Sequence, residues 1–328
     1  MEHAVGWAIV GIVAALLLAD LLMRLPFVRV VLPIFENVPP FGVRPSPPVP
    51  EAEPLEITTR DGLTLRGSLH RPPRGKPRGL IVFCPELQSN HWSAAAYCPG
   101  LVEAGFAVLA FDFRNQGESD SLPGYEPLHW MTRYEVADVE AVLDHAARSP
   151  ELKDLPVGLF GISRGGGTAL AAAANRPRVR CVACDSSFSI DAMTMFFAAR
   201  WAEVYVPRWL LRLIPQWHLR TTLALVRLVS QWRRGVPYAV LERSLRRLRD
   251  RPVLMVAGTA DTYVRPAVAQ ELARRIGPSC SVWVVKGAKH NMARAKHPEE
   301  YDRRMVEFFA AGLDSADAAG RVAARLPI

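Results

Sequence analysis

The chain has 328 residues, half of them hydrophobic, which is enough to bury one large core or two smaller ones. Its net charge of +8 is concentrated, because twelve arginines against three acidic residues give the segment 200–251 a net charge of +9. The remainder is close to neutral, so the charge pattern excludes the spread or helix-borne basic surface of a nucleic-acid-binding protein.

The amino-terminal segment is long and apolar. Ala4–Met23 contains one charged residue, Asp20, and is long enough to cross a hydrocarbon layer of about 30 Å as a helix. No Lys or Arg precedes it and no small-x-small cleavage site follows, so we expect an uncleaved anchor rather than a signal peptide. Arg24 and Arg29 follow the apolar run, which favours a cytoplasmic globular part, with a periplasmic or extracellular one as the alternative.

A proline-rich stretch follows the anchor. The segment 33–54 holds eight prolines, which predicts a semi-rigid extended spacer, so that residues 1–54 form anchor plus spacer. The globular part begins near Leu55 with a hairpin, residues 55–59 and 63–67, turning at Asp61-Gly62.

Buried strands then alternate with helices along the chain. We expect a doubly wound, mostly parallel sheet with an antiparallel amino-terminal edge, a core of residues 55–187 and 251–312, and a flexible tail at 313–328. The expected strands are 79–84, 106–111, 156–160, 179–184, 253–257 and 281–285, and the expected helices are 93–104, 134–148, 168–175, 270–276 and 298–309.

One segment interrupts this alternation. Residues 188–250 insert helical sequence rich in arginine, together with four tryptophans: Trp201, Trp209, Trp217 and Trp232. Two interpretations stay open. The insertion is a helical subdomain that packs its own aromatics, or it is a lid whose Trp/Arg surface meets lipid headgroups or amphiphilic substrates.

The pentapeptide Gly161-Ile162-Ser163-Arg164-Gly165 lies between an expected strand and an expected helix. A serine on such a turn can take a strained backbone conformation that projects its hydroxyl, and the flanking glycines avoid a collision of Cβ with the neighbouring strand or helix. The motif therefore makes Ser163 a candidate nucleophile, which requires a base, an acid and an oxyanion hole elsewhere in the chain.

The base and the acid should follow strands, because sites of open α/β sheets lie beyond the carboxyl ends of the strands. His290 follows the last strand and is the candidate base. Asp261 follows the strand 253–257 in a short polar loop and is the candidate acid, with Asp185, at the end of the preceding strand, as its rival.

The order Ser163, Asp261, His290 resembles the α/β-hydrolase superfamily, and its serine esterase and lipase-like branch with an inserted helical lid, over residues 55–310. The segment Phe111-Asp112-Phe113-Arg114-Asn115-Gln116-Gly117-Glu118-Ser119 is similar to a structural loop of that branch, so we assign no chemistry to Asp112 or Arg114.

The resemblance implies acyl transfer through a Ser-His-Asp triad, with the oxyanion held by the backbone N–H groups of Arg164 and Leu87. The chain departs from the family pattern here, since Pro85-Glu86 stands where that loop often begins with His-Gly. A carboxylate beside an oxyanion is unfavourable unless it is paired or points away. We expect Glu86 to face a structural partner or to pair with Arg164 or Arg114; the alternatives are contact with a polar substrate or an impaired site.

The sequence thus predicts a membrane-anchored serine hydrolase that cleaves a carboxylic ester of a lipid or another amphiphile. A peptidase or thioesterase with the same triad, and a non-catalytic hydrolase-like domain that binds a ligand, remain alternatives. No metal or organic cofactor site is expected, and the oligomeric state is not fixed by the sequence.

Overall fold

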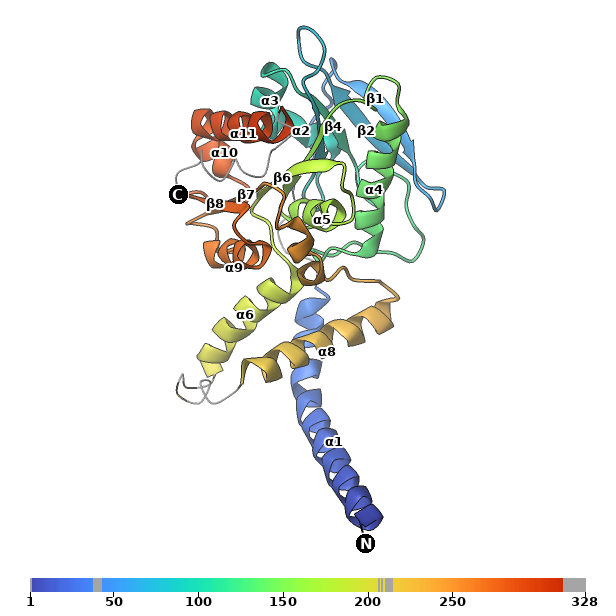
Figure 1. Cartoon of the computed structure of the whole chain (residues 1–328), viewed down its shortest axis with the longest axis vertical. Helices are drawn as coiled ribbons and strands as arrows, with labels where there is room; N and C mark the ends of the chain where they lie inside the picture. The colour runs from blue at the N-terminus through green and yellow to red at the C-terminus, as the bar shows by residue number, and fades with distance from the viewer. Residues whose placement is uncertain (1, 38–42, 206, 208, 210–214, 315–328) are drawn as a thin grey trace. The chain divides into compact units, whose positions relative to one another are not determined.

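An eight-stranded sheet forms the core of the larger part of the chain (Figure 1). The computed structural model describes residues 2–37, 43–205, 207, 209 and 215–314, so the carboxyl-terminal end of the expected tail lies outside the described residues. The strands follow the order β1-β2-β4-β3-β5-β6-β7-β8, antiparallel from β1 through β2 to β4 and parallel elsewhere. Their bounds are β1 Glu53–Thr58, β2 Thr64–His70, β3 Leu80–Cys84, β4 Ala107–Phe111, β5 Val157–Ile162, β6 Val179–Asp185, β7 Val253–Gly258 and β8 Cys280–Val285. The expected fold class, with its antiparallel amino-terminal edge, is confirmed.

Helices cover both faces of this sheet. Successive residues of β3 alternate between two apolar clusters, Leu80 and Val82 entering one and Ile81 and Phe83 the other, as the pleat of a strand requires. The helices are η1 His91–Ser93, α2 Ala94–Tyr97, α3 Pro99–Glu103, α4 Arg133–Arg148, α5 Arg164–Ala173, η2 Leu241–Arg243, η3 Leu245–Leu248, α9 Pro266–Ile276, α10 Ala293–Lys296 and α11 Pro298–Leu313. Strands β3, β4, β5 and β7 are buried along their whole length, which explains their uninterrupted apolar sequences, whereas the edge strand β8 is only partly buried.

Several helices differ from the expected ones: α9 begins at Pro266, four residues early, and α11 continues to Leu313, four residues beyond its expected end. The single helix expected over residues 93–104 is broken into η1, α2 and α3 at Cys98, because Pro99 cannot continue the preceding helix and instead starts the next one. Helix α5 begins at Arg164, directly after the candidate nucleophile and four residues before the expected start. Its first turn contains three consecutive glycines, whose low helix propensity hides the start in the sequence.

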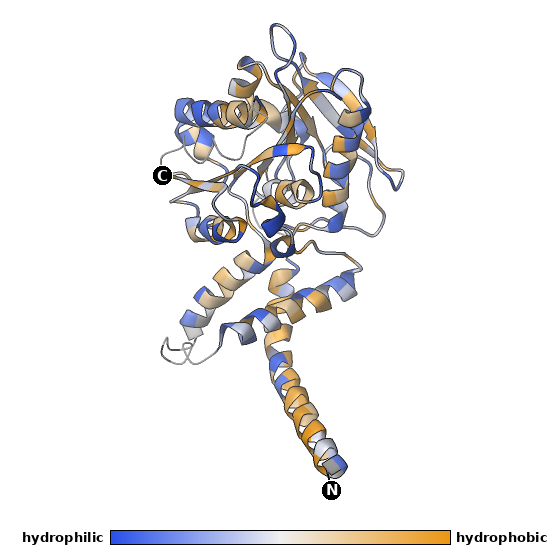
Figure 2. Cartoon of the chain, in the orientation of Figure 1, coloured by the Kyte–Doolittle hydropathy of each residue, from blue (hydrophilic) through white to orange (hydrophobic). Residues whose placement is uncertain are grey.

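A second, smaller unit joins the amino-terminal segment to part of the insertion, residues 1–38 with 197–236. It contains α1 Glu2–Phe35 and α8 Gln216–Arg234, and α6 Ile190–Tyr205 runs into it from the sheet-containing unit. Residues Val5–Phe35 are long and apolar enough to cross a membrane by length and composition, and the first part of α1 is coloured mostly hydrophobic in Figure 2.

Helix α1 continues into the segment expected to be a spacer. Pro26 and Pro33 both lie inside it, although proline removes a backbone hydrogen bond. Val28, Leu32 and Phe35 are buried on one side of this part of α1, and α1 and α8 pack against each other. This packing stabilises the proline-containing part of α1 as a helix, an effect that the local sequence does not predict.

Candidate active site

Ser163 stands on a strained turn between β5 and α5. Its backbone has φ 52° and ψ −119°, outside the regions that a residue with a side chain ordinarily adopts. A Cβ on Gly161 would lie 2.5 Å from the Cα of Gly166, and one on Gly165 would lie 2.3 Å from the carbonyl oxygen of Cys84. Both flanking glycines are therefore required by close backbone approach, as the sequence motif predicts.

The structure brings Ser163, His290 and Asp261 together in one hydrogen-bonded chain. Ser163 Oγ lies 2.9 Å from His290 Nε2, and His290 Nδ1 lies 2.8 Å from Asp261 Oδ2. The second carboxylate oxygen of Asp261 accepts the backbone N–H groups of Tyr263 and Val264, both at 2.8 Å. Asp261 is fully buried, so these bonds fix its carboxylate in one orientation toward the imidazole.

The rival carboxyl group, Asp185, has different partners. Asp185 accepts hydrogen bonds from the hydroxyls of Ser186 and Tyr301, both at 2.9 Å, and burial raises its pKa to about 6. Ser186 Oγ in turn accepts the backbone N–H of Asn291 at 3.1 Å. Asp185 therefore supports the loop that carries His290 instead of contacting the imidazole, and the sequence does not predict this network.

The loop after β3 packs directly on the beginning of α5. The carbonyl oxygens of Cys84 and Pro85 would lie 2.3 and 2.4 Å from a Cβ on Gly165, which places this loop next to the residue that follows Arg164. Gln88 holds the loop in a left-handed conformation, φ 65°, and its N–H donates to Gln116 Oε1 at 2.8 Å. Within the described part of the chain, no backbone acceptor takes up the N–H of Leu87 or of Arg164. Both candidate oxyanion donors therefore lie on segments in direct contact.

Glu86 is buried in this same loop. Its Oε1 accepts the hydroxyl of Tyr97 at 3.3 Å, and the Tyr97 hydroxyl also lies 3.4 Å from the carbonyl oxygen of Asn291. Burial raises the pKa of Glu86, an effect that the Tyr97 hydrogen bond and the nearby His290 only partly oppose. Glu86 thus has a structural partner in Tyr97, which the sequence does not reveal because the two residues lie on different elements.

The side chains of Arg164 and Arg114 are directed to other carboxylates. The Arg164 guanidinium donates to the carbonyl oxygen of Leu128 at 3.0 Å and to Glu135 at 3.2 Å. Arg114 donates to Asp138 and Asp61, and these ion pairs raise its pKa although burial opposes them. Neither arginine therefore pairs with Glu86, so the pairing that the sequence suggested for Glu86 is not found in the structure.

Asp112 fixes the conformation of its own loop. Its carboxylate accepts the backbone N–H groups of His91 and Glu118, and a Cβ on Gly117 would lie 2.1 Å from its Oδ2. Asp112 and Arg114 thus both stabilise the fold around this segment.

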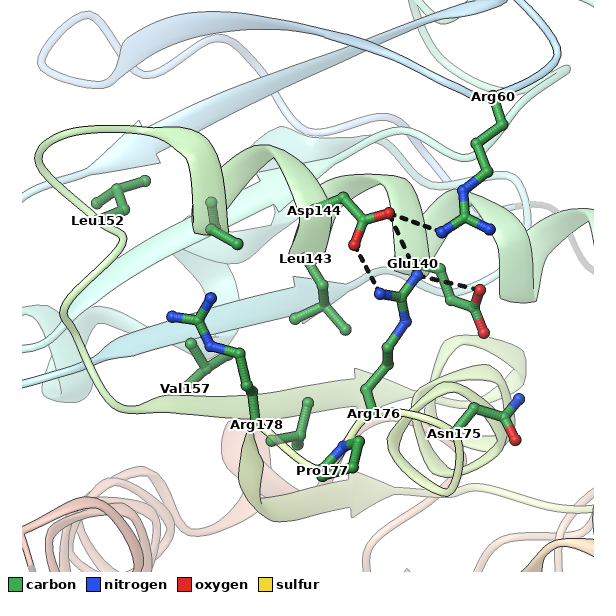
Figure 3. Close-up of a pocket in the computed structure, with 13 residues that line it drawn as sticks. Arg60, Glu140, Leu143, Asp144, Leu152, Val157, Asn175, Arg176, Pro177 and Arg178 are labelled. Atoms are coloured by element: carbon green, nitrogen blue, oxygen red, sulfur yellow. Dashed lines mark hydrogen bonds and ion pairs between the residues drawn. The ribbon is translucent and has the colours of Figure 1, made fainter.

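A cavity of about 520 Å³ lies elsewhere, at the amino ends of β5 and β6 (Figure 3). Arg176 crosses it and pairs with Glu140 and Asp144, as the dashed lines in Figure 3 show. Ser163 follows the carboxyl end of β5, so this cavity is at the other end of the strand and does not belong to the candidate active site.

The sheet order, the turn at Ser163 and the Ser–His–Asp chain define the α/β-hydrolase class. The profile of the alpha/beta hydrolase family matches residues 82–304, and the chain belongs to this family. Solved structures agree with the fold. An esterase from Pyrococcus furiosus is 22% identical with a TM-score of 0.60, covering 85% of this chain and 98% of its own. Est1E from Butyrivibrio proteoclasticus with bound ferulic acid is 18% identical with a TM-score of 0.59, covering 80% of this chain and 100% of its own.

Curated relatives are similar over shorter segments. An uncharacterized 31.7 kDa protein of Escherichia coli is 32% identical over 121 residues, 36% of this chain and 41% of its own length. The thiohydrolase aneE of Aspergillus aculeatus is 30% identical over 131 residues, 39% of each chain. The chain thus matches about two fifths of the length of these relatives.

Proposed function

We propose that the protein is a serine hydrolase that cleaves carboxylic esters with Ser163 as nucleophile, His290 as general base and Asp261 as the residue that orients the imidazole. The observation that carries this proposal is the pair of short contacts, 2.9 Å from Ser163 Oγ to His290 Nε2 and 2.8 Å from His290 Nδ1 to Asp261. An activated serine requires a base hydrogen-bonded to its hydroxyl and a carboxylate that orients the base, and the three residues are connected in that order.

In the first step the Ser163 oxygen forms a bond to the acyl carbon while its proton passes to His290 Nε2. The tetrahedral intermediate then collapses, the ester C–O bond breaks, and the leaving alkoxide takes the proton from His290. Water attacks the acyl-enzyme with His290 again as base, which releases the carboxylic acid and restores Ser163. Asp261 stabilises the imidazolium that forms in these steps.

The oxyanion is held by the N–H groups of Leu87 and Arg164. The support for this assignment is the contact between the β3–α2 loop (residues 85–93, which include η1) and the start of α5 at Gly165, together with the availability of both N–H groups. Burial raises the pKa of Glu86, which favours its neutral form relative to an exposed carboxyl group and so lessens the repulsion of a developing oxyanion.

An amphiphilic acyl compound is the substrate class that suits the remainder of the chain. The apolar helix α1 supports membrane anchoring. Next to the triad, the ring of Tyr263 makes edge-to-face contacts with Phe188, at a centroid distance of 6.0 Å, and with His290, at 5.2 Å. Such an aromatic wall favours an apolar acyl chain and limits access of water. The similarity to a thiohydrolase makes thioesters the second substrate class to test.

The decisive experiment treats the full-length protein in detergent with a fluorophosphonate probe, beside a Ser163→Ala control. We expect labelling of the wild-type protein alone, and then hydrolysis of a panel of esters and thioesters that increases with acyl chain length. A folded wild-type protein that takes no label refutes the catalytic proposal. Turnover restricted to short, water-soluble esters refutes the amphiphilic substrate but leaves the triad in place.

We further propose that α1 anchors the protein and that the hydrolase unit faces the cytoplasm, since Arg24 and Arg29 follow the apolar stretch. Protease treatment of intact cells tests the orientation. Digestion of the hydrolase unit from the outside would place it in the periplasmic or extracellular space instead.

A further inference from the structure

Helix α1 consists of two parts with different surroundings. Its first part is exposed and apolar, whereas Arg24, Val28, Leu32 and Phe35 are buried on one side of its second part. The segment Val5–Met23 rises about 28 Å as a helix, close to the thickness of a hydrocarbon layer. If α1 spans a membrane, Arg24 therefore marks the level at which the helix leaves the hydrocarbon.

Arg24 also ties α8 to that level. Its guanidinium donates to Asp20 at 2.8 Å and to the hydroxyls of Thr221 and Thr222 at 2.6 and 3.2 Å. It lies 3.2 Å from His218 Nδ1, which is itself 3.4 Å from Asp20. The first turns of α8 are thus fixed beside the end of the apolar stretch by a network of charged and polar groups.

Four tryptophans of residues 197–236 are exposed. Trp201, Trp209, Trp217 and Trp232 are 50%, 67%, 61% and 85% exposed, and Trp217 directly precedes His218. Large aromatic side chains gain little by standing in water, whereas the headgroup region of a bilayer accepts both the apolar ring and the indole N–H. Trp217, next to His218 of the Arg24 network, lies where a membrane-interface belt would be needed.

Basic residues accompany these tryptophans on α8. Arg220, Arg227 and Arg234 recur every seven residues and so lie along one side of the helix, Arg220 exposed and the other two half-buried, beside a face that exposes Trp217, Leu228 and Trp232. The helix carries no acidic residue. An exposed apolar face bordered by arginines is complementary to an anionic lipid surface.

We propose that α8, with its exposed Trp217 and Trp232, is a second membrane-contact surface, which binds the anionic headgroup layer at the level where α1 leaves the hydrocarbon. This inference rests on the proposed membrane anchoring by α1. Bound in this way, the insertion meets amphiphilic molecules in the bilayer. Of the two interpretations of the insertion that the sequence leaves open, the proposal thus adopts the one in which its Trp/Arg surface contacts lipid, and the partner is a lipid surface rather than a protein.

The test attaches an environment-sensitive fluorophore next to the tryptophans without removing one. In the full-length protein, Cys280, the most accessible of the native cysteines, is replaced by Ser, and Gln216→Cys takes the label. The matched control places the label at Lys76→Cys, an exposed position between β2 and β3. Both proteins are reconstituted in phosphatidylcholine vesicles, with or without phosphatidylglycerol, that contain a nitroxide at headgroup depth.

We expect stronger headgroup quenching at residue 216 than at residue 76, increasing with phosphatidylglycerol. Trp217→Ala should reduce this quenching, and Arg220→Gln should weaken the docking equilibrium about fivefold, the effect of one basic residue at an anionic surface. Equal quenching at residues 216 and 76 would overturn the proposal, and quenching that ignores phosphatidylglycerol would overturn its electrostatic part.

Fluorophosphonate labelling of the same vesicles separates this inference from the proposed chemistry. Quenching at residue 216 without labelling of Ser163 refutes the catalytic role alone. Labelling of Ser163 without quenching at residue 216 refutes the membrane-contact surface alone. Loss of both reconstitution and quenching refutes the anchor on which the surface depends.

Discussion

The substitution Gly165→Ala tests whether the β3–α2 loop supplies an oxyanion donor. A Cβ at this position would lie 2.3 Å from the carbonyl oxygen of Cys84 and 2.4 Å from that of Pro85, whereas an ordinary contact begins at 3.4 Å. Both are backbone atoms that cannot rotate aside, so the loop must retreat by about 1 Å. The N–H of Leu87 moves with it.

Two effects on stability oppose each other in this variant. Overpacking costs about 1–3 kcal/mol, and replacing glycine by alanine in a helix gains about 1 kcal/mol. The net loss in the free energy of unfolding should therefore stay below about 2 kcal/mol. Catalysis should suffer more, because the loss of one oxyanion donor lowers kcat by about 10²–10³.

The assay compares kcat, KM and thermal unfolding of Gly165→Ala with those of Gly167→Ala. A Cβ on Gly167 would crowd the side chain of Met131 at 2.1 Å and the carbonyl oxygen of Phe188 at 2.6 Å, in the same helix but away from the loop. We expect similar losses of stability and a much larger fall in kcat for Gly165→Ala. A folded Gly165→Ala protein with wild-type kcat would refute the assignment of Leu87.

Three further substitutions test the carboxyl groups around His290. Asp261→Asn should lower kcat about 10⁴-fold through loss of the imidazole orientation, measured on a soluble ester, and a loss below tenfold would contradict its role. Glu86→Gln should remove the decline in activity that accompanies ionisation of Glu86, which its raised pKa moves above the usual range of a carboxyl group; identical pH profiles of the variant and the wild-type protein would exclude this. Burial raises the pKa of Asp185 from 3.8 to about 6, so its protonated form stabilises the fold below 3.8 and this contribution is lost as pH rises through 6. In the wild-type protein this loss lowers the free energy of unfolding by about 3 kcal/mol between pH 4 and pH 7, and Asp185→Asn should remove it. Chemical denaturation at the two pH values measures this, and a variant with the same pH dependence of stability as the wild type would count against the assignment.

Local pattern was enough to predict the sheet and the site residues. Gly161 and Gly165 flank a serine between a strand and a helix, and Asp261 and His290 each follow a buried strand. In a parallel sheet the carboxyl ends of neighbouring strands meet at one edge, so position in the chain order is sufficient to bring such residues together. The fold prediction is confirmed, and the catalytic roles stay predictions.

The partners of these residues were beyond prediction for a physical reason. Tyr97 reaches Glu86 and the His290 loop from a helix that the sequence presents as uninterrupted, and Arg24 contacts α8 almost two hundred residues away. These contacts depend on side-chain directions set by tertiary packing, and no periodicity records them. The start of α5 was missed because glycines fill its first turn, although the turn is held by the contact of Gly165 with the β3–α2 loop.

The unusual Glu86 fits an electrostatic division among the carboxyl groups near His290. The carboxylate of Asp261 accepts two backbone N–H groups and lies against the imidazole. Glu86 and Asp185 are buried with hydroxyl partners instead, and their pKa values are raised. Burial thus shifts Glu86 and Asp185 toward their neutral forms relative to exposed carboxyl groups, while hydrogen-bond donors surround Asp261 where the imidazolium forms. Opposite environments for neighbouring carboxyl groups are the arrangement by which acid and base roles are separated in hydrolytic sites. The Pro85-Glu86 departure from the family pattern is therefore compatible with catalysis as long as Glu86 stays protonated, and the pH profile of Glu86→Gln is the measurement that decides it.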